Sequence, residues 1–278
     1  MTSNGGHSAV GISGEQVRFY QTFGYLVLKS FFSPEELKVI CSEVDCAFEE
    51  QHDEPFDGNT RRDVYLVDEL TPFCAGLLEY PRCLTAAKQL EGEDILGHVC
   101  HAAECVGDSD WHRDTKTSFQ SGMGFRCYLD PVDADSGALQ VMPASHRIPR
   151  YYDDDDPLWA GVVPLPVKDV PATCLATKPG DVVAIDFRIW HGSYGGRPGR
   201  RMVSIDYFDN PRNVRSEQFL CEQAVSAGKA QLKAKSGRDY IFARNWLFGT
   251  AVSEQRQQWI SRLGDIGYFD PPGVVQQD

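Results

Sequence analysis

Between residues 95 and 208 the chain alternates short apolar runs with turn-forming residues, and this pattern limits the fold more than any other feature. Turn signals such as Asp130-Pro131 and Pro179-Gly180-Asp181 separate the runs. Many short strands at such spacing are typical of a β-sandwich or barrel. We therefore expect an all-β core of jelly-roll, cupin-like form, with strands at 95–106, 124–129, 138–142, 182–187 and 202–208.

Helical signals flank this β-rich region on both sides. Ser13 and Ser33 are placed to cap two N-terminal helices, and Pro34 suits the first position of the second helix. Gly24 is expected to end the first helix. The other elements expected outside the core are a strand at 25–28 and helices at about 72–90 and 216–235.

No linker in the sequence separates independent domains, and 278 residues is a normal length for one β-rich domain. We expect a flexible polar tail at 1–13 and a single domain over 14–278. The expected parts of that domain are a helical layer at about 14–92, a jelly-roll core at about 93–210 with a long insertion near 147–172, and a C-terminal helical segment at about 211–265.

The chain is acidic, with a formal net charge of -13 and a pI of about 5.0. Such a surface repels nucleic acid and anionic lipid, so we expect neither as a partner. Nine cysteines without a C-x-x-C pair, no N-terminal export signal and no long apolar stretch favour free thiols in the cytoplasm. The expected partner is a small-molecule substrate, and a homodimer is compatible with these features.

Two histidines and an aspartate stand out as candidate metal ligands. His112 and Asp114 lie two residues apart, so in an extended strand both side chains point to the same face. They supply two ligands of the 2-His-1-carboxylate facial triad, which holds non-haem Fe(II) and leaves positions for O2 and substrate oxygens. His191, which follows a turn and a strand, is the expected third ligand. Because H-x-D alone is common, a structural role stays open on this pattern.

Two adjacent arginines, Arg200 and Arg201, follow His191 and open another strand. A guanidinium can hold a carboxylate through two parallel hydrogen bonds. The distal carboxylate of 2-oxoglutarate bound to iron needs such a partner. Strand alternation places the two arginines on opposite faces, and Arg200 shares its face with the polar Ser204 and Asp206. We therefore expect Arg200 to face the interior of the core.

The remaining histidines fit a metal site less well. His98 and His101 lie on the preceding strand, and their spacing of three predicts that they face opposite sides of the sheet. His146 follows a turn, where a structural role is expected.

These features together resemble the phytanoyl-CoA dioxygenase family of Fe(II)- and 2-oxoglutarate-dependent oxygenases, over about residues 15–210. The segments that match are Phe23–Val27 with Phe31–Leu37, the W-H-x-D-T motif at Trp111–Thr115, Ser136–His146 and Pro179–Ser193. The resemblance implies a double-stranded β-helix with flanking helices. It also implies that His112, Asp114 and His191 bind iron, and that Arg200, Ser193 and Thr115 bind 2-oxoglutarate.

The resemblance further implies oxidation of a small metabolite or natural-product intermediate by O2, with release of succinate and CO2. Halogenating relatives carry a small residue where this chain has Asp114, so we expect hydroxylation or a related oxidation rather than chlorination. Some positions depart from the usual motifs without removing a ligand: Arg113, Ser136, Gln140 and Ala144. An anionic group of the substrate is expected to meet Arg61, Arg62 or Arg126.

Two other classes also fit these residues. One is a different metalloenzyme of cupin-like fold, such as a zinc hydrolase or a dioxygenase without a cosubstrate, which would not need Arg200. The other is a catalytically silent metal-binding protein that keeps the fold. Succinate release that depends on 2-oxoglutarate separates the first class from the favoured one, and an iron titration separates the second.

Overall fold

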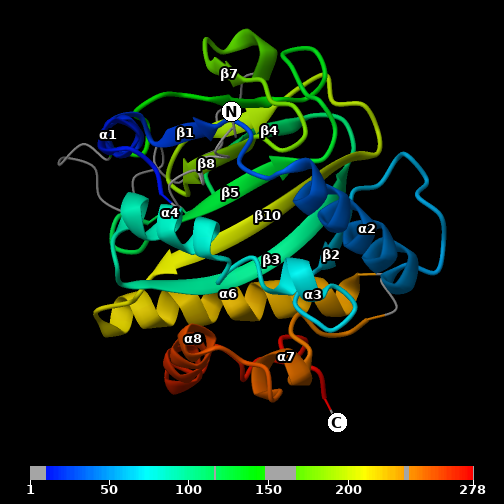
Figure 1. The fold of residues 1–278 in the computed structure, drawn as a ribbon, viewed down its shortest axis with the longest axis vertical. Helices are drawn as coiled ribbons and strands as arrows, with labels where there is room; N and C mark the ends of the chain where they lie inside the picture. The colour runs from blue at the N-terminus through cyan, green and yellow to red at the C-terminus, as the bar shows by residue number, and fades with distance from the viewer. Residues whose placement is uncertain (1–10, 116, 148–166, 235–237, 278) are drawn as a thin grey trace, which may run out of the picture.

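Two antiparallel sheets form the centre of the protein (Figure 1), whose computed structural model describes residues 11–115, 117–147, 167–234 and 238–277. The larger sheet has the strand order β1 (Tyr25–Leu28), β8 (Val182–Asp186), β5 (Gly122–Tyr128), β10 (Arg200–Asp209), β3 (Ile95–Cys105) and β2 (Arg62–Tyr65). The smaller sheet has the order β4 (Ser109–His112), β9 (His191–Ser193), β6 (Leu139–Val141) and β7 (Thr173–Leu175).

The two sheets pack face to face at one end. Tyr25, Val183 and Ile185 of the larger sheet form a buried cluster with Leu139 and Val141 of the smaller one. These residues come from the apolar runs and the strand at 25–28 that the sequence predicts. Burial of such side chains holds the sheets together there and leaves the space at the other end for polar groups.

The N-terminal helices α1 (Gly14–Phe23), α2 (Pro34–Gln51) and α4 (Pro81–Glu91) and the short α3 (Pro72–Ala75) cover the outer face of the larger sheet (Figure 1). Ser13 and Ser33 cap α1 and α2, each within a capping box, as predicted. Gly24 ends α1 with a φ of 81°, a left-handed conformation that favours glycine.

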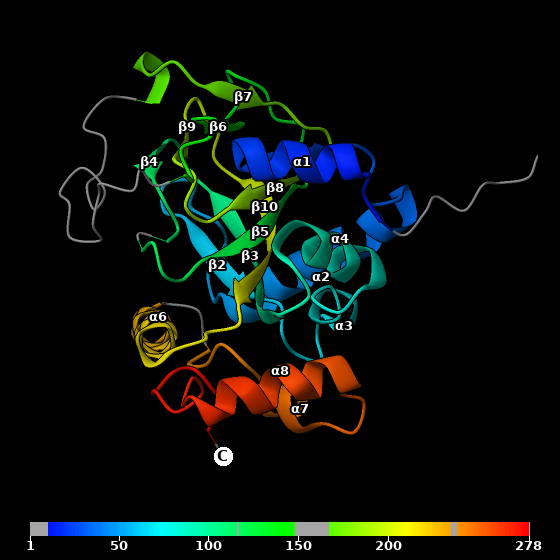
Figure 2. The same cartoon turned by 90° about the vertical axis from the view of Figure 1, so that its left-hand side faces the viewer.

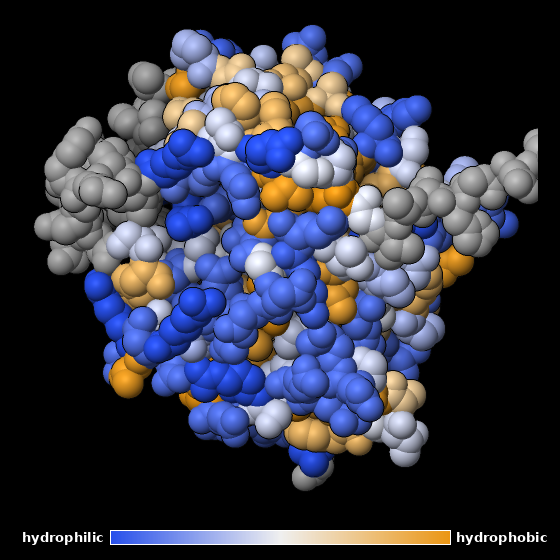
Figure 3. Space-filling model, turned by 60° about the vertical axis from the view of Figure 1, so that its left-hand side comes forward, coloured by the Kyte–Doolittle hydropathy of each residue, from blue (hydrophilic) through white to orange (hydrophobic). Residues whose placement is uncertain are grey.

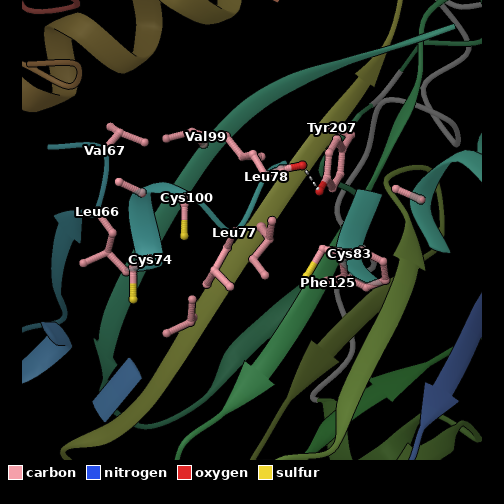
Figure 4. Close-up of a cluster of buried hydrophobic side chains, with 14 of the residues drawn as sticks. Leu66, Val67, Cys74, Leu77, Leu78, Cys83, Val99, Cys100, Phe125 and Tyr207 are labelled. Carbon is pink, nitrogen blue, oxygen red and sulfur yellow. Dashed lines mark hydrogen bonds between the residues drawn. The ribbon is translucent and has the colours of Figure 1, made fainter. Parts of the chain in front are cut away.

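Apolar side chains from these helices meet the sheet in one large core (Figure 4). Leu77 and Cys83 lie against Phe125 and Tyr207 of the central strands, and all four are buried. The Tyr207 hydroxyl donates a hydrogen bond of 2.7 Å to the carbonyl of Leu78, which satisfies the one polar atom of that ring.

The expectation of one continuous helix from about Pro72 to Leu90 is wrong, because this segment forms two helices. The chain leaves the helical conformation after α3 at Gly76 and resumes it at Pro81. Glycine weakens a helix, and a proline disfavours the helical conformation of the residue before it, here Tyr80. Both signals are visible in the sequence.

The C-terminal part adds α6 (Val214–Lys233), α7 (Arg244–Phe248) and α8 (Glu254–Asp265), which lie beyond β3 in Figures 1 and 2. Trp259 of α8 donates a hydrogen bond of 2.8 Å to the Ile95 carbonyl of β3. The last residues are irregular, but Tyr268 and Val274 are fully buried, so this segment packs onto the protein.

Two expected segments lie partly outside the described residues. Most of the insertion near 147–172 falls there, and only the 3-10 helix Val167–Asp169 is described within it. The backbone of Ile12, within the predicted tail, exchanges hydrogen bonds of 2.8 and 3.1 Å with the side chain of Gln89, and residues 1–10 of that tail lie outside the described residues. Within the described ranges, no helix is both long and apolar enough to cross a membrane.

Candidate metal centre

Three side chains converge between the two sheets. His112 ends β4 and pairs with His191, the first residue of β9, while Asp114 follows β4 in a bend. Oδ1 of Asp114 lies 3.7 Å from Nε2 of His112 and 3.6 Å from Nε2 of His191. All three ligand atoms lie within 4.8 Å of one another. Strand pairing thus brings together residues that are almost eighty positions apart in the chain.

Backbone carbonyls orient both imidazole rings. Nδ1 of His112 lies 2.7 Å from the carbonyl oxygen of Asp110, and Nδ1 of His191 lies 3.0 Å from that of Ile189. A carbonyl only accepts, so each Nδ1 carries the proton and each Nε2 presents a lone pair to the space beside Asp114. Burial lowers the pKa of His191 to about 4, which keeps this imidazole neutral at neutral pH.

Arg126 of β5 fixes the carboxylate. Its Nη2 donates a hydrogen bond of 2.9 Å to Oδ2 of Asp114, and its Nη1 contacts Oδ1 of Asp206 on β10. Burial alone would raise the pKa of Asp114, but His191, Arg126 and His112 outweigh it and hold that pKa below its ordinary value. Asp114 is therefore ionised, with Oδ1 directed at the two histidines.

This donor set fits a divalent metal ion of the Fe(II) type. Two imidazole nitrogens and one carboxylate oxygen lie within 4.8 Å of one another, and they are the donor set of a 2-His-1-carboxylate facial triad. The fixed Nδ1 protons and the arginine on Oδ2 are the supporting contacts that metal ligands require.

A cavity of about 530 Å³ adjoins the three side chains. One face of β10 lines this cavity. Every second residue of the strand contributes to the lining: Arg200, Met202, Ser204, Asp206 and Phe208. His112, Asp114 and His191 also line the cavity, so a metal at these ligands would be open to small molecules.

Arg200 and Arg201 point to opposite sides of β10, as the alternation predicts. Arg200 lines the cavity and is 3 % exposed, and its Nε and Nη1 atoms have no hydrogen-bond partner within the described parts of the chain. Arg201 instead forms ion pairs with Asp45 and Asp130 on the outer side. The Cys105 thiol is a hydrogen-bonding neighbour of this guanidinium, but a buried guanidinium without an anionic partner is costly unless a ligand supplies the anion.

Two glycines make room for Arg200. A Cβ atom at Gly137 or Gly196 would overlap its Nη1. Ser193 and Thr115 line the same cavity and are buried, at 4 % and 2 % exposure. The three residues expected to bind 2-oxoglutarate therefore share one cavity with the three expected metal ligands.

Comparison with known proteins agrees with this geometry. The phytanoyl-CoA dioxygenase (PhyH) family profile matches residues 20–202. The chain belongs to the phytanoyl-CoA dioxygenase family. An ectoine dioxygenase from Bordetella bronchiseptica is 28% identical over 222 residues, which are 68% of this chain and 72% of that protein.

Solved structures of similar fold include EvdO2 from Micromonospora carbonacea var. aurantiaca in complex with 2-oxoglutarate, at a TM-score of 0.55 and 20% identity, covering 73% of this chain and 93% of that chain. Another is the epimerase SnoN with Fe3+, alpha ketoglutarate and nogalamycin RO, at a TM-score of 0.57 and 19% identity, covering 70% of this chain and 83% of that chain. These structures confirm the double-stranded β-helix. The family match together with the dioxygenase relatives confirms the expected class, an oxygenase dependent on Fe(II) and 2-oxoglutarate.

Arg61 and Arg62, both expected to meet an anionic group of the substrate, differ in their position relative to the cavity. Arg61 lines the cavity but pairs with Asp63, 2.8 Å away. Arg62 is not among the cavity residues, because it pairs with Glu104 and lies over the rings of Phe48 and Phe56. The expectation that Arg62 meets the substrate is therefore corrected.

The expectation that His98 and His101 face opposite sides is also wrong, since both line the cavity. The pairing of β3 with β10 shifts register between Asp206 and Tyr207, and His98 is the extra residue of the resulting β-bulge. A bulge reverses the alternation on one side of it. Nothing in the local sequence indicates this shift, apart from the polar character of a histidine on a buried strand.

Proposed function

We propose that His112, Asp114 and His191 hold one Fe(II) ion through their Nε2, Oδ1 and Nε2 atoms, and that the protein hydroxylates a small molecule with release of succinate and CO2. One observation carries this proposal. A three-ligand cluster with two oriented imidazoles opens onto the same cavity as a buried, unpaired guanidinium. The cluster suits a metal, and the guanidinium suits a dicarboxylate cosubstrate.

The proposed place of 2-oxoglutarate follows from charge and position. Its distal carboxylate would pair with Arg200, and the hydroxyls of Ser193 and Thr115 are available as further donors. Gly137 and Gly196 keep the guanidinium close to the loops beside it. The bound iron supplies the coordination positions at which 2-oxoglutarate and O2 meet.

The residues around the metal have separate tasks. Arg126 occupies Oδ2 of Asp114, so that Oδ1 alone faces the histidines and the remaining coordination positions stay open. The larger sheet, its helices and the buried end of the smaller sheet pack around apolar clusters beside the site, while the side chains of His112 and Asp114 are 38% and 28% exposed and stay accessible to small molecules. Because Asp114 is present, its carboxylate occupies the position that a halide needs, which supports hydroxylation over chlorination.

The alternatives fit the site less well. Neither a zinc hydrolase nor a catalytically silent metal-binding protein has a use for a buried guanidinium without a carboxylate partner beside its metal. The test is succinate formation by the purified protein with Fe(II), 2-oxoglutarate and O2. We expect uncoupled succinate release that requires all three. Tight iron binding without any succinate would contradict the proposal, and metal-dependent hydrolysis without O2 would favour the zinc enzyme.

We further propose that the enzyme works in the cytoplasm, which the nine free cysteines support. The net charge of -13 disfavours nucleic acid and anionic membranes as partners, and Figure 3 shows a mainly hydrophilic face. A homodimer would cover the exposed rings of Phe19 and Phe23 on α1, and light scattering of the purified chain tests for it.

A further inference from the structure

The cavity extends to both sides of the metal ligands along β10. Ser204 marks its middle, because it pairs with Arg126 of β5, the residue that binds Asp114. Towards the start of β10 lies the part that holds Arg200. Towards its end lies a second part, the His98 arm, whose residues are His98, His101, Phe187, Ser204, Phe208 and Gln223. If 2-oxoglutarate occupies the Arg200 side, the His98 arm is the space left for the substrate.

The His98 arm has no spare charge for an ionic substrate group. The charged side chains beside it are Arg126 and Asp206, and they pair with each other. Arg126 also pairs with Asp114, so this one cation is shared by two carboxylates and is not free to bind an anionic substrate group. Among the described residues that line the cavity, Arg61 has its own partner in Asp63, and Arg200 alone has no carboxylate partner.

Uncharged hydrogen-bonding groups remain free in this arm. Ser204 is 1 % exposed, and its Oγ has no hydrogen-bond partner in the described parts of the chain. The same holds for Nδ1 of His101, which is the direct neighbour of Ser204 on β3. Its distance of 3.9 Å from Oδ2 of Asp206 exceeds a hydrogen bond. Two adjacent buried polar atoms that lack partners point to a ligand that supplies them.

Both histidines of the arm are neutral. Burial lowers the pKa of His98 to about 3 and also lowers that of His101. Nδ1 of His98 lies 2.7 Å from the Tyr268 hydroxyl, which fixes the ring. The imidazoles therefore act as hydrogen-bonding groups and not as cations.

Aromatic rings form the wall at the far end. The ring centroids of His98 and Phe208 are 4.4 Å apart, and those of Phe187 and Phe208 are 5.9 Å apart with the rings nearly perpendicular, at 80°. Such rings favour the flat, apolar face of a cyclic molecule.

We infer that the His98 arm selects an uncharged cyclic substrate that carries hydroxyl or carbonyl groups, held by Ser204 and His101 and packed against Phe208. This inference rests on the proposed function. It predicts that acyl thioesters of coenzyme A and zwitterionic amino-acid-like compounds are poor substrates, because the described charged residues of this arm, Arg126 and Asp206, already pair with each other.

The test uses the full chain loaded with Fe(II) and 2-oxoglutarate and three sets of probes at equal concentration. The neutral set holds methyl glycosides and hydroxylated aromatic ketones, the zwitterionic set holds ectoine and L-proline, and the anionic set holds acetyl and decanoyl coenzyme A. The readout is succinate release above the uncoupled rate. We expect stimulation by the neutral set. Strongest stimulation by a charged probe, or none by any neutral probe while uncoupled release proceeds, would overturn the inference. Absence of uncoupled release would instead contradict the proposed function.

A pair of serine variants then tests the role of Ser204. Ser204→Ala should raise the KM of the best neutral probe about fivefold or more, since a buried polar group of the probe loses its partner. The affinity for 2-oxoglutarate, measured without O2, reports whether the cavity itself is intact. Ser226→Ala, on the exposed side of α6, is the matched control and should change neither quantity. An unchanged KM in Ser204→Ala would overturn the assignment of this residue.

Discussion

Replacement of Arg200 by alanine should weaken 2-oxoglutarate binding far more than the same change at Arg201. Arg200 is 3 % exposed and pairs with no carboxylate of the residues that the structure describes, so the cosubstrate would be its ionic partner. Removal of one partner from a buried pair costs about 3–5 kcal/mol. At about 1.4 kcal/mol per tenfold change, the Kd of 2-oxoglutarate should rise about a hundredfold or more.

Arg201 provides the matched control on the same strand. Its side chain is 25% exposed and pairs on the outer side with Asp45, which is 54% exposed. The loss of such a pair costs under about 0.7 kcal/mol, so Arg201→Ala should change the Kd less than about threefold. The assay is anaerobic titration of 2-oxoglutarate into the Fe(II)-loaded protein, followed by visible absorbance. Iron affinity should survive in both variants. A large effect at Arg201 with a small one at Arg200 would refute the assigned faces of β10.

Three further changes probe the site. Asp114→Gly should open a coordination position and leave Arg126 without that carboxylate. Chloride should then change the absorbance of the Fe(II)–2-oxoglutarate complex. No change would mean that water fills the position. Arg126→Met should lower the free energy of unfolding in urea by about 3 kcal/mol, since the buried carboxylate of Asp206 loses its cation; a loss under about 1 kcal/mol would contradict this. Gly196→Ala should displace the Arg200 guanidinium, because the added Cβ would overlap it. The affinity for 2-oxoglutarate should fall about tenfold or more, which is less than for complete loss of the guanidinium. Gly264→Ala, in open space on α8, should leave that affinity unchanged.

Local patterns in the sequence were sufficient to predict much of the fold and the cluster of candidate metal ligands. The capping serines Ser13 and Ser33 and the left-handed Gly24 set helix ends through contacts within a few residues. The strands follow from short apolar runs between turns. His112 and Asp114 were predictable as a pair because two residues of spacing brings their side chains to one side, although β4 ends at His112 and Asp114 lies in the bend that follows.

Other features depend on contacts between distant segments and leave no local signal. The bulge that places His98 beside His101 depends on how β3 pairs with β10. The double pairing of Arg126 with Asp114 and Asp206 depends on three segments meeting. The break between α3 and α4, in contrast, is predictable from the local sequence, because Gly76 and Pro81 both disfavour a continuous helix.

The central claim is that one iron ion and 2-oxoglutarate share the cavity between the two sheets. Anomalous diffraction at the iron edge tests it most directly, with crystals grown without O2 in Fe(II) and 2-oxoglutarate. We predict one iron peak between Nε2 of His112, Oδ1 of Asp114 and Nε2 of His191, with the distal carboxylate of 2-oxoglutarate against Arg200. An iron peak away from these three atoms, or a carboxylate bound elsewhere than at Arg200, would contradict the account.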